Sequence, residues 1–276
     1  HRDREVSGGT ILIVALSVGL LAALGGPAVA HAGGTLLAAH RGGARLWPEN
    51  SLLAFRNAIA LGADFLELDV HLTKDGAVVV IHDPTLERTT TGAGGVSDRT
   101  LAELGALRLK DRGGKVTTEA LPTLDDVVRL AAPTPVRLLL EIKVDTKQAR
   151  YPGIEEKVIE ILDSHGMAAR TIVMAFEEDT VLRIRTLRPD LTVGGLAETR
   201  STVTREINEL QKLGARFIGL HQELVTAEVV TQAAKAGLLL GVWTVNDPGA
   251  MKRFIELRVG VLITDRPDLA RELLRR

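Results

Sequence analysis

Strand-like and helix-like segments alternate eight times along most of this 276-residue chain, and this alternation limits the fold more than any other feature. Each strand-like run is short and rich in Val, Leu and Ile, and a segment with apolar residues at helical spacing follows it. Strands that are buried on both faces and joined through helices form parallel sheets. The runs lie at residues 35–40, 65–70, 137–143, 171–176, 192–197, 217–220, 238–245 and 261–264.

Eight such units in about 245 residues predict an α/β protein with a closed (β/α)8 TIM barrel. The structural alternative is a doubly wound open sheet, which normally uses fewer strands for this length. One unit departs from the pattern, because residues 72–122 separate the second strand from its helix. This segment contains the hairpin signal Lys74-Asp75-Gly76 and a strand-like run at 77–81. We therefore predict a small insertion after strand 2, on the C-terminal face of the barrel.

The composition excludes several classes of site. The chain has 34 basic and 35 acidic residues, a net charge of −1, and no basic stripe that would follow a nucleic-acid backbone. It has no cysteine, which excludes disulfides, thiolate nucleophiles and zinc–thiolate sites. We therefore expect a small-molecule substrate and no nucleic-acid partner.

The first 32 residues have the pattern of a secretory signal peptide. A basic start at Arg2 and Arg4 is followed by an apolar run at 11–24, and then by the small residues Ala28 and Ala30. The apolar run is shorter than the roughly 20 residues that a membrane-spanning helix needs. We therefore expect a secreted protein, with residues 33–276 as the catalytic domain and no stable membrane insertion after cleavage. The alternative is an uncleaved N-terminal anchor.

Carboxylates gather where the active site of a TIM barrel lies, at the C-terminal ends of the strands. Glu67 and Asp69 are two residues apart on one strand, so both side chains point to the same face. Glu141 adds a third carboxylate from the next strand. Three carboxylates without a thiolate predict a site for one divalent cation, Ca²⁺ or Mg²⁺. The alternative is a salt-bridge network with Lys143 and Arg41.

Two histidines and two cations accompany this cluster. Cleavage of a phosphodiester needs a base for the attacking hydroxyl and an acid for the leaving alkoxide, and His40 and His82 are suited to both tasks. Arg41 and Lys143 would bind the phosphate oxygens, Arg41 through its planar guanidinium group. We therefore predict acid–base cleavage of a phosphodiester at this rim.

Short motifs follow one another along the chain in a fixed order. They are His40-Arg41-Gly42, Pro48-Glu49-Asn50-Ser51, Glu67-Leu68-Asp69-Val70, His82-Asp83-Pro84, Glu141-Ile142-Lys143, Val242-Trp243-Thr244 and Ile263-Thr264-Asp265. Each motif is weakly specific alone. Together they resemble the glycerophosphodiester phosphodiesterase family over residues 35–276.

The resemblance implies a barrel with an insertion after strand 2. It implies that Glu67, Asp69 and Glu141 bind the metal, and that His40 and His82 form the acid–base pair. In that family a glycerol hydroxyl attacks phosphorus, and water then opens the resulting cyclic phosphate. The products would be glycerol 3-phosphate and an alcohol such as choline or ethanolamine. The sequence does not assign the order in which the two histidines act.

Other residues and other functions also follow from the sequence. Trp243 would lie against the glycerol or head group, although so large a side chain also suits a core. Phe176 has a weaker claim to the same role.

One alternative function is phospholipase D-like cleavage of lysophospholipid or sphingolipid. The other is a catalytically inactive surface binding protein.

Overall fold

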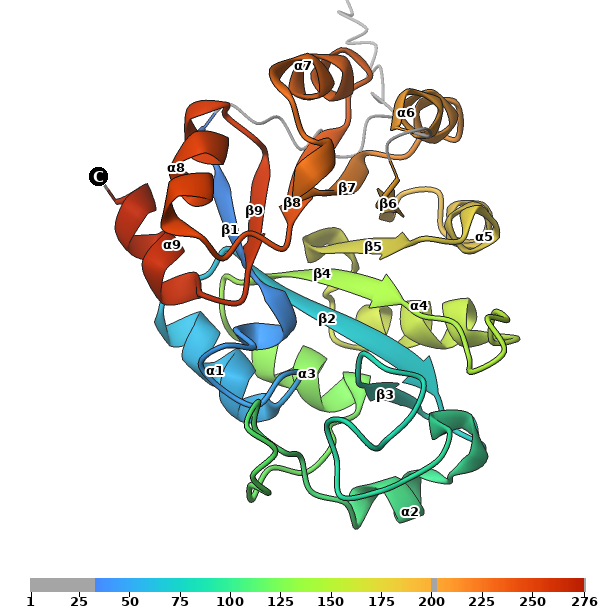
Figure 1. The fold of residues 1–276 in the computed structure, drawn as a ribbon. Helices are drawn as coiled ribbons and strands as arrows, with labels where there is room; N and C mark the ends of the chain where they lie inside the picture. Colours follow the sequence, from blue (N-terminus) through green and yellow to red (C-terminus); the bar gives the residue numbers. More distant parts are fainter. Residues whose placement is uncertain (1–32, 200–202, 276) are drawn as a thin grey trace, which may run out of the picture.

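A computed structural model of the protein describes residues 33–199 and 203–275 (Figure 1). The predicted signal peptide, residues 1–32, lies outside the described residues, so export stays a prediction. Among the described residues, none of the helices combines the length and the hydrophobicity needed to cross a membrane.

Eight parallel strands close into a barrel, which confirms the predicted TIM-barrel fold (Figure 1). β1 (Leu36–Ala39) pairs in parallel with β2 (Phe65–Leu72) on one side and with β9 (Val261–Thr264) on the other. Because this pairing of the first strand with the last closes the ring of strands, the open doubly wound alternative is wrong. The other barrel strands are β4 (Arg137–Ile142), β5 (Thr171–Ala175), β6 (Thr192–Ala197), β7 (Phe217–His221) and β8 (Leu239–Trp243).

Helices surround the barrel, and their starts follow local capping rules. Ser51 caps the first helix by accepting a hydrogen bond from the Ala54 amide. Thr123 and Asp126 form a capping box at the start of the second helix of the barrel. These helices are α1 (Leu52–Ala60), α3 (Leu124–Ala131), α4 (Ile154–Ser164), α5 (Glu178–Leu187), α6 (Val203–Lys212), α7 (Ala227–Lys235), α8 (Pro248–Glu256) and α9 (Pro267–Leu274).

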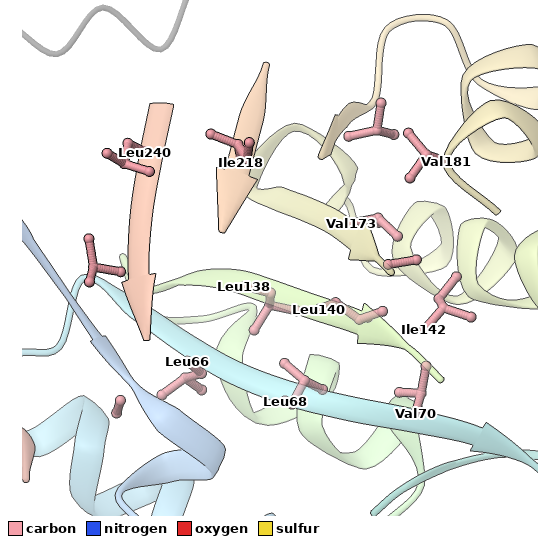
Figure 2. Packing of buried hydrophobic residues seen from close by; sticks show 14 of the residues in the cluster. Leu66, Leu68, Val70, Leu138, Leu140, Ile142, Val173, Val181, Ile218 and Leu240 are labelled. Atoms are coloured by element: carbon pink, nitrogen blue, oxygen red, sulfur yellow. The ribbon is translucent and has the colours of Figure 1, made fainter. Parts of the chain in front are cut away.

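Alternation along each strand separates two apolar layers. Leu66, Leu68 and Val70 of β2 point outward and pack in the cluster between the barrel and its helices (Figure 2). Phe65 points inward and packs in the barrel interior with Phe217. A fully buried side chain of this size contributes about 1.5–3 kcal/mol to stability. The same alternation turns Glu67 and Asp69 inward, above the apolar floor of the barrel.

The segment between β2 and α3 forms the predicted insertion with a small core of its own. β3 (Val78–Val80) pairs antiparallel with the end of β2 through the predicted hairpin turn. The short helix α2 (Leu101–Gly105) was not predicted, because five residues are too few to show helical spacing. The insertion core consists of Val79, Ile81, Leu86, Val96, Leu104, Leu109 and Leu121. This core supports the loop that carries His82.

Candidate active site

A pocket of about 510 Å³ opens at the C-terminal ends of the strands. Seven of the eight predicted site residues line it, and Asp69 is the exception. The seven are His40, Arg41, Glu67, His82, Glu141, Lys143 and Trp243. The structure thus brings together residues that are separated by up to two hundred positions in the sequence.

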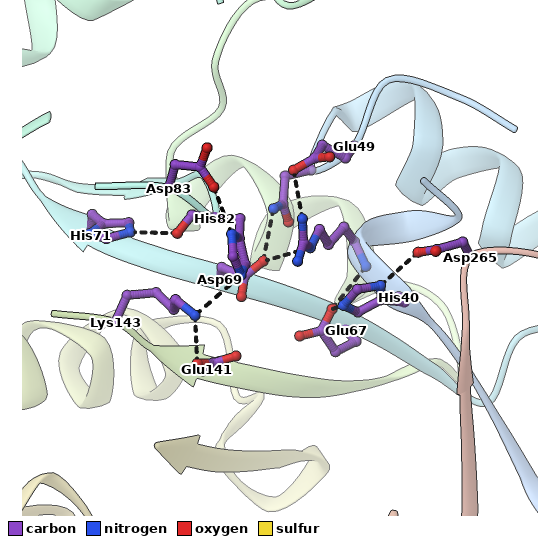
Figure 3. A network of polar contacts seen from close by, with 12 residues as sticks. His40, Glu49, Glu67, Asp69, His71, His82, Asp83, Glu141, Lys143 and Asp265 are labelled. Carbon is purple, nitrogen blue, oxygen red and sulfur yellow. Dashed lines mark hydrogen bonds and ion pairs between the residues drawn. The ribbon is translucent and has the colours of Figure 1, made fainter. Parts of the chain in front are cut away.

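The three carboxylates form one compact cluster beneath the pocket (Figure 3). Ligand oxygens of Glu67, Asp69 and Glu141 all lie within 4.8 Å of one another, and no side chain of the three is more than 9% exposed. Asp69 Oδ1 is buried and has no hydrogen-bond partner among the described residues. Unpaired carboxylate oxygens in such a cluster suit a hard divalent cation, so these residues fit the implied metal.

The electrostatics of the cluster also favour a bound cation. Burial, together with the charges of Asp69 and Glu141, raises the pKa of Glu67 well above its usual range. Burial likewise raises the pKa of Glu141 to about 7. Burial alone would raise the pKa of Asp69 as well. The electrostatic effects of His82, Arg41 and Lys143 outweigh the effect of burial, so the pKa of Asp69 is lowered. Without a cation, the cluster therefore retains protons that a metal ion would displace.

The stabilisation by a divalent cation is expected to increase with pH. The pKa of Glu141 is raised from 4.5 to about 7 in the folded protein. The metal-free folded state therefore binds protons more tightly than the unfolded chain, and its free energy of unfolding falls as pH rises through this window. A bound cation replaces those protons. The increase in Tm on adding Ca²⁺ or Mg²⁺ should be larger near pH 8 than near pH 5 in differential scanning fluorimetry. An equal increase at both values would contradict this assignment.

A tight turn positions His40 at the end of β1. Arg41 and Gly42 both have left-handed backbone conformations, with φ of 51° and 81°. A Cβ atom at Gly42 would lie 2.7 Å from the Cβ of Ala54, so glycine is required there. The turn also directs the Arg41 amide to Glu67, whose Oε2 accepts its hydrogen bond at 2.8 Å. The His-Arg-Gly motif is therefore the backbone device that places the first histidine.

Asp265 holds the ring of His40 and was not identified from the sequence. His40 Nδ1 donates to Asp265 Oδ1 at 2.6 Å, and Asn246 Nδ2 donates to the other oxygen at 2.8 Å. His40 Nε2 is thereby turned toward Glu67, 3.9 Å from its Oε2. Burial alone would raise the pKa of Asp265, but the hydrogen bond from His40 helps to lower it. The signals in the sequence were the position of Asp265 directly after the last strand and its place in the motif Ile263-Thr264-Asp265, neither of which indicated a contact with His40.

His82 is held from three sides (Figure 3). Its Nδ1 donates to Asp83 Oδ1 at 2.8 Å, and its Nε2 lies 3.3 Å from Lys143 Nζ. His71 Nε2 donates to the His82 carbonyl oxygen at 2.9 Å, while the Tyr151 hydroxyl donates to His71 Nδ1 at 2.8 Å. Burial lowers the pKa of His71 to about 4, so its ring is neutral and keeps this arrangement. His71 therefore positions the loop of the second histidine.

Arg88 joins the loop of His82 to the turn that follows β1. Its guanidinium group donates two hydrogen bonds to Asp83, at 2.7 and 2.9 Å, and two to Glu49, both at 2.8 Å. Glu49 also accepts from Arg41 Nη1 at 3.0 Å. The contacts of Arg88, which the sequence did not predict, link the two loops that carry the histidines.

The remaining predicted residues face the same pocket. Lys143 Nζ donates to Glu141 Oε1 at 2.8 Å. Trp243 meets Phe176 edge to face, with ring centroids 6.0 Å apart. The ring of His221 also packs edge to face with Trp243, with centroids 5.2 Å apart, but His221 is not among the residues that line the pocket. Lys143 Nζ also lies 5.9 Å from the centroid of the Phe176 ring, so charged and aromatic groups meet in this pocket.

Two imidazoles and two cations beside an acidic cluster define a barrel enzyme that cleaves phosphate esters. Comparison with known proteins agrees with this class. The glycerophosphoryl diester phosphodiesterase family matches residues 40–269. A glycerophosphodiester phosphodiesterase from Caldanaerobacter subterraneus subsp. tengcongensis is 37% identical over 248 residues, covering 88% of this chain and 98% of that protein. Another, from Bacillus subtilis, is 31% identical, covering 94% and 95%.

A solved structure shows the same fold. It is a glycerophosphodiester phosphodiesterase from Parabacteroides distasonis, with a TM-score of 0.73, 26% identity, and coverage of 88% of this chain and 97% of that one. The chain belongs to the glycerophosphoryl diester phosphodiesterase family. Its activity is that of a glycerophosphodiester phosphodiesterase, which confirms the predicted enzyme class and excludes the alternative of a catalytically inactive surface binding protein.

Proposed function

We propose that the protein hydrolyses glycerophosphodiesters to glycerol 3-phosphate and an alcohol, with His40 and His82 as the acid–base pair. The observation that carries this proposal is one pocket lined by both imidazoles and by Glu67 and Glu141 of the buried acidic cluster. One Ca²⁺ or Mg²⁺ ion, held by Glu67, Asp69 and Glu141, would supply charge stabilisation for the reacting phosphate.

The two histidines are held in matching ways. In each ring an aspartate binds Nδ1, and Nε2 lies near a charged group of the pocket. This arrangement supports proton transfer through Nε2 in both cases. One imidazole would accept the proton of the attacking glycerol hydroxyl, and the other would donate a proton to the leaving alkoxide. The two roles would reverse when water opens the cyclic phosphate.

Arg41 and Lys143 would bind the phosphate. Burial alone would lower the pKa of Lys143, but the charges of Glu141 and Asp69 outweigh it and raise that pKa, so the side chain stays cationic. The guanidinium group of Arg41 forms a hydrogen bond with Glu49. It stays charged because, against the effect of burial, the neighbouring carboxylates of Asp69, Glu49 and Glu67 raise its pKa. Both cations line the pocket next to the histidines, where they would offset the negative charge of the transition state.

A coupled assay tests this proposal. The purified protein is incubated with glycerophosphocholine, with and without EDTA, and released glycerol 3-phosphate is measured with its dehydrogenase. We expect product only when Ca²⁺ or Mg²⁺ is present, and titration of each ion separately identifies the one that is used. Product formation that EDTA does not affect would overturn the metal assignment. Cleavage of lysophosphatidylcholine without cleavage of glycerophosphocholine would favour the phospholipase D-like alternative.

A further inference from the structure

We infer that the pocket wall formed by Phe176, Glu177, Glu198 and Trp243 binds a positively charged head group on the leaving alcohol. This inference rests on the proposed hydrolysis. Glu198 directly follows β6, which is four strands away from β1 in either direction around the barrel. Glu198 therefore lies on the opposite side of the barrel from the turn that carries His40, so a substrate that spans the pocket reaches both sides.

Two carboxylates of this wall are without an ion-pair partner among residues 33–199 and 203–275. Glu177 and Glu198 line the pocket, and neither side chain forms an ion pair with any other residue in the described part of the chain. Glu177 precedes α5 but forms no capping hydrogen bond with that helix. The cations nearest to the reaction, Arg41 and Lys143, are already paired with other carboxylates. Two carboxylates that are unpaired within the described part of the chain favour a cationic ligand.

The aromatic side chains of the wall favour the same chemistry. Phe176 is 40% exposed, one of few large apolar side chains with such exposure among the described residues. Its ring meets Trp243 nearly perpendicularly, at 86°, so the two rings form a corner in the pocket. Faces of aromatic rings attract ammonium groups, and quaternary ammonium groups are bound in this way in aromatic cages. An ammonium group at this corner would share the pocket with the carboxylates of Glu177 and Glu198.

A cationic head group should therefore be preferred over a neutral one. We expect kcat/KM for glycerophosphocholine or glycerophosphoethanolamine to exceed that for glycerophosphoglycerol by about tenfold, because one cation–π contact and a carboxylate pair at a partly exposed site are each weak. The phosphate and the glycerol that provides the nucleophile are the same in all three substrates. The ratio of kcat/KM values therefore reports on the head group alone.

The test is the double variant Glu177→Gln/Glu198→Gln, assayed with all three substrates. Its ratio of cationic to neutral kcat/KM should fall to about one, while hydrolysis of glycerophosphoglycerol stays within about twofold of the wild-type protein. Glu178→Gln/Glu228→Gln removes the same charge from exposed helix positions outside the pocket, and should keep the wild-type ratio. Phe176→Leu should lower hydrolysis of glycerophosphocholine more than that of glycerophosphoglycerol.

The outcomes separate this inference from the function on which it rests. Equal hydrolysis of cationic and neutral substrates by the wild-type protein would overturn the inference alone. An unchanged ratio in the Glu177→Gln/Glu198→Gln variant would overturn it too, and would assign Glu177 an ordinary role beside the N-terminus of α5. If none of the three substrates is hydrolysed with either ion, the proposed function is wrong, and the head-group inference is wrong with it.

Discussion

Replacement of His82 by alanine is expected to lower kcat by roughly 10²–10⁴-fold, the usual contribution of a general acid or base. The same loss is expected for His40→Ala, because each imidazole transfers a proton in both halves of the proposed reaction. KM should change far less, since the phosphate is bound mainly by Arg41 and Lys143. Steady-state kinetics with glycerophosphocholine at saturating metal measure both parameters.

A histidine outside the pocket provides the matched control. His165 forms its hydrogen bond with Asp125 at 2.7 Å and does not line the pocket, so His165→Ala should leave kcat within about twofold. Asp265→Asn keeps the ring of His40 but weakens its orientation, and should give an intermediate loss with an altered pH profile. A decrease of less than tenfold for His40→Ala or His82→Ala would refute the role of that histidine.

The second large effect is expected for Glu67→Gln, which should lower divalent-metal affinity by about 100-fold or more. Residues that merely support metal ligands contribute about 10–100-fold, so loss of a charged ligand should cost at least as much. Isothermal titration calorimetry of the metal-free protein with Ca²⁺ and with Mg²⁺ measures the affinity. Activity at limiting metal should fall in proportion and recover partly at high metal concentration.

Glu155→Gln separates loss of a ligand from loss of a buried charge. Glu155 is 2% exposed and forms an ion pair with Arg150. It is not a member of the acidic cluster. Its replacement should lower Tm and leave metal affinity unchanged. Unchanged metal affinity in Glu67→Gln would remove Glu67 from the proposed ligands.

The barrel and most of the site could be predicted because they depend on local periodicity. Alternation with a period of two residues determined which face carries Glu67 and Asp69, and the structure has both inside the barrel. The rule that active sites lie at the carboxyl ends of barrel strands then selected His40 and Glu141. Both inferences use only the position of a residue along its own strand, and not its contacts with other strands.

The contacts that orient these residues could not be predicted in the same way. His40 and Asp265 are 225 positions apart, and Arg88 and Glu49 are 39 apart. Such pairs depend on the closure of the barrel and on the path of the insertion, which leave no periodic pattern in the sequence. Helix α2 was missed because its short length gives too little signal.

Closure of the barrel has a consequence for how activity is acquired. The pair of β1 with β9 joins the beginning and the end of the described chain, and His40 and Asp265 lie directly beyond that joint. Contacts between residues this far apart carry the largest loop-closure entropy and form slowly. A partly closed barrel would already hold Glu67, Asp69 and Glu141 on adjacent strands, but it would lack the oriented imidazole. Recovery of activity during refolding should therefore report on the last step of assembly, later than the recovery of metal binding.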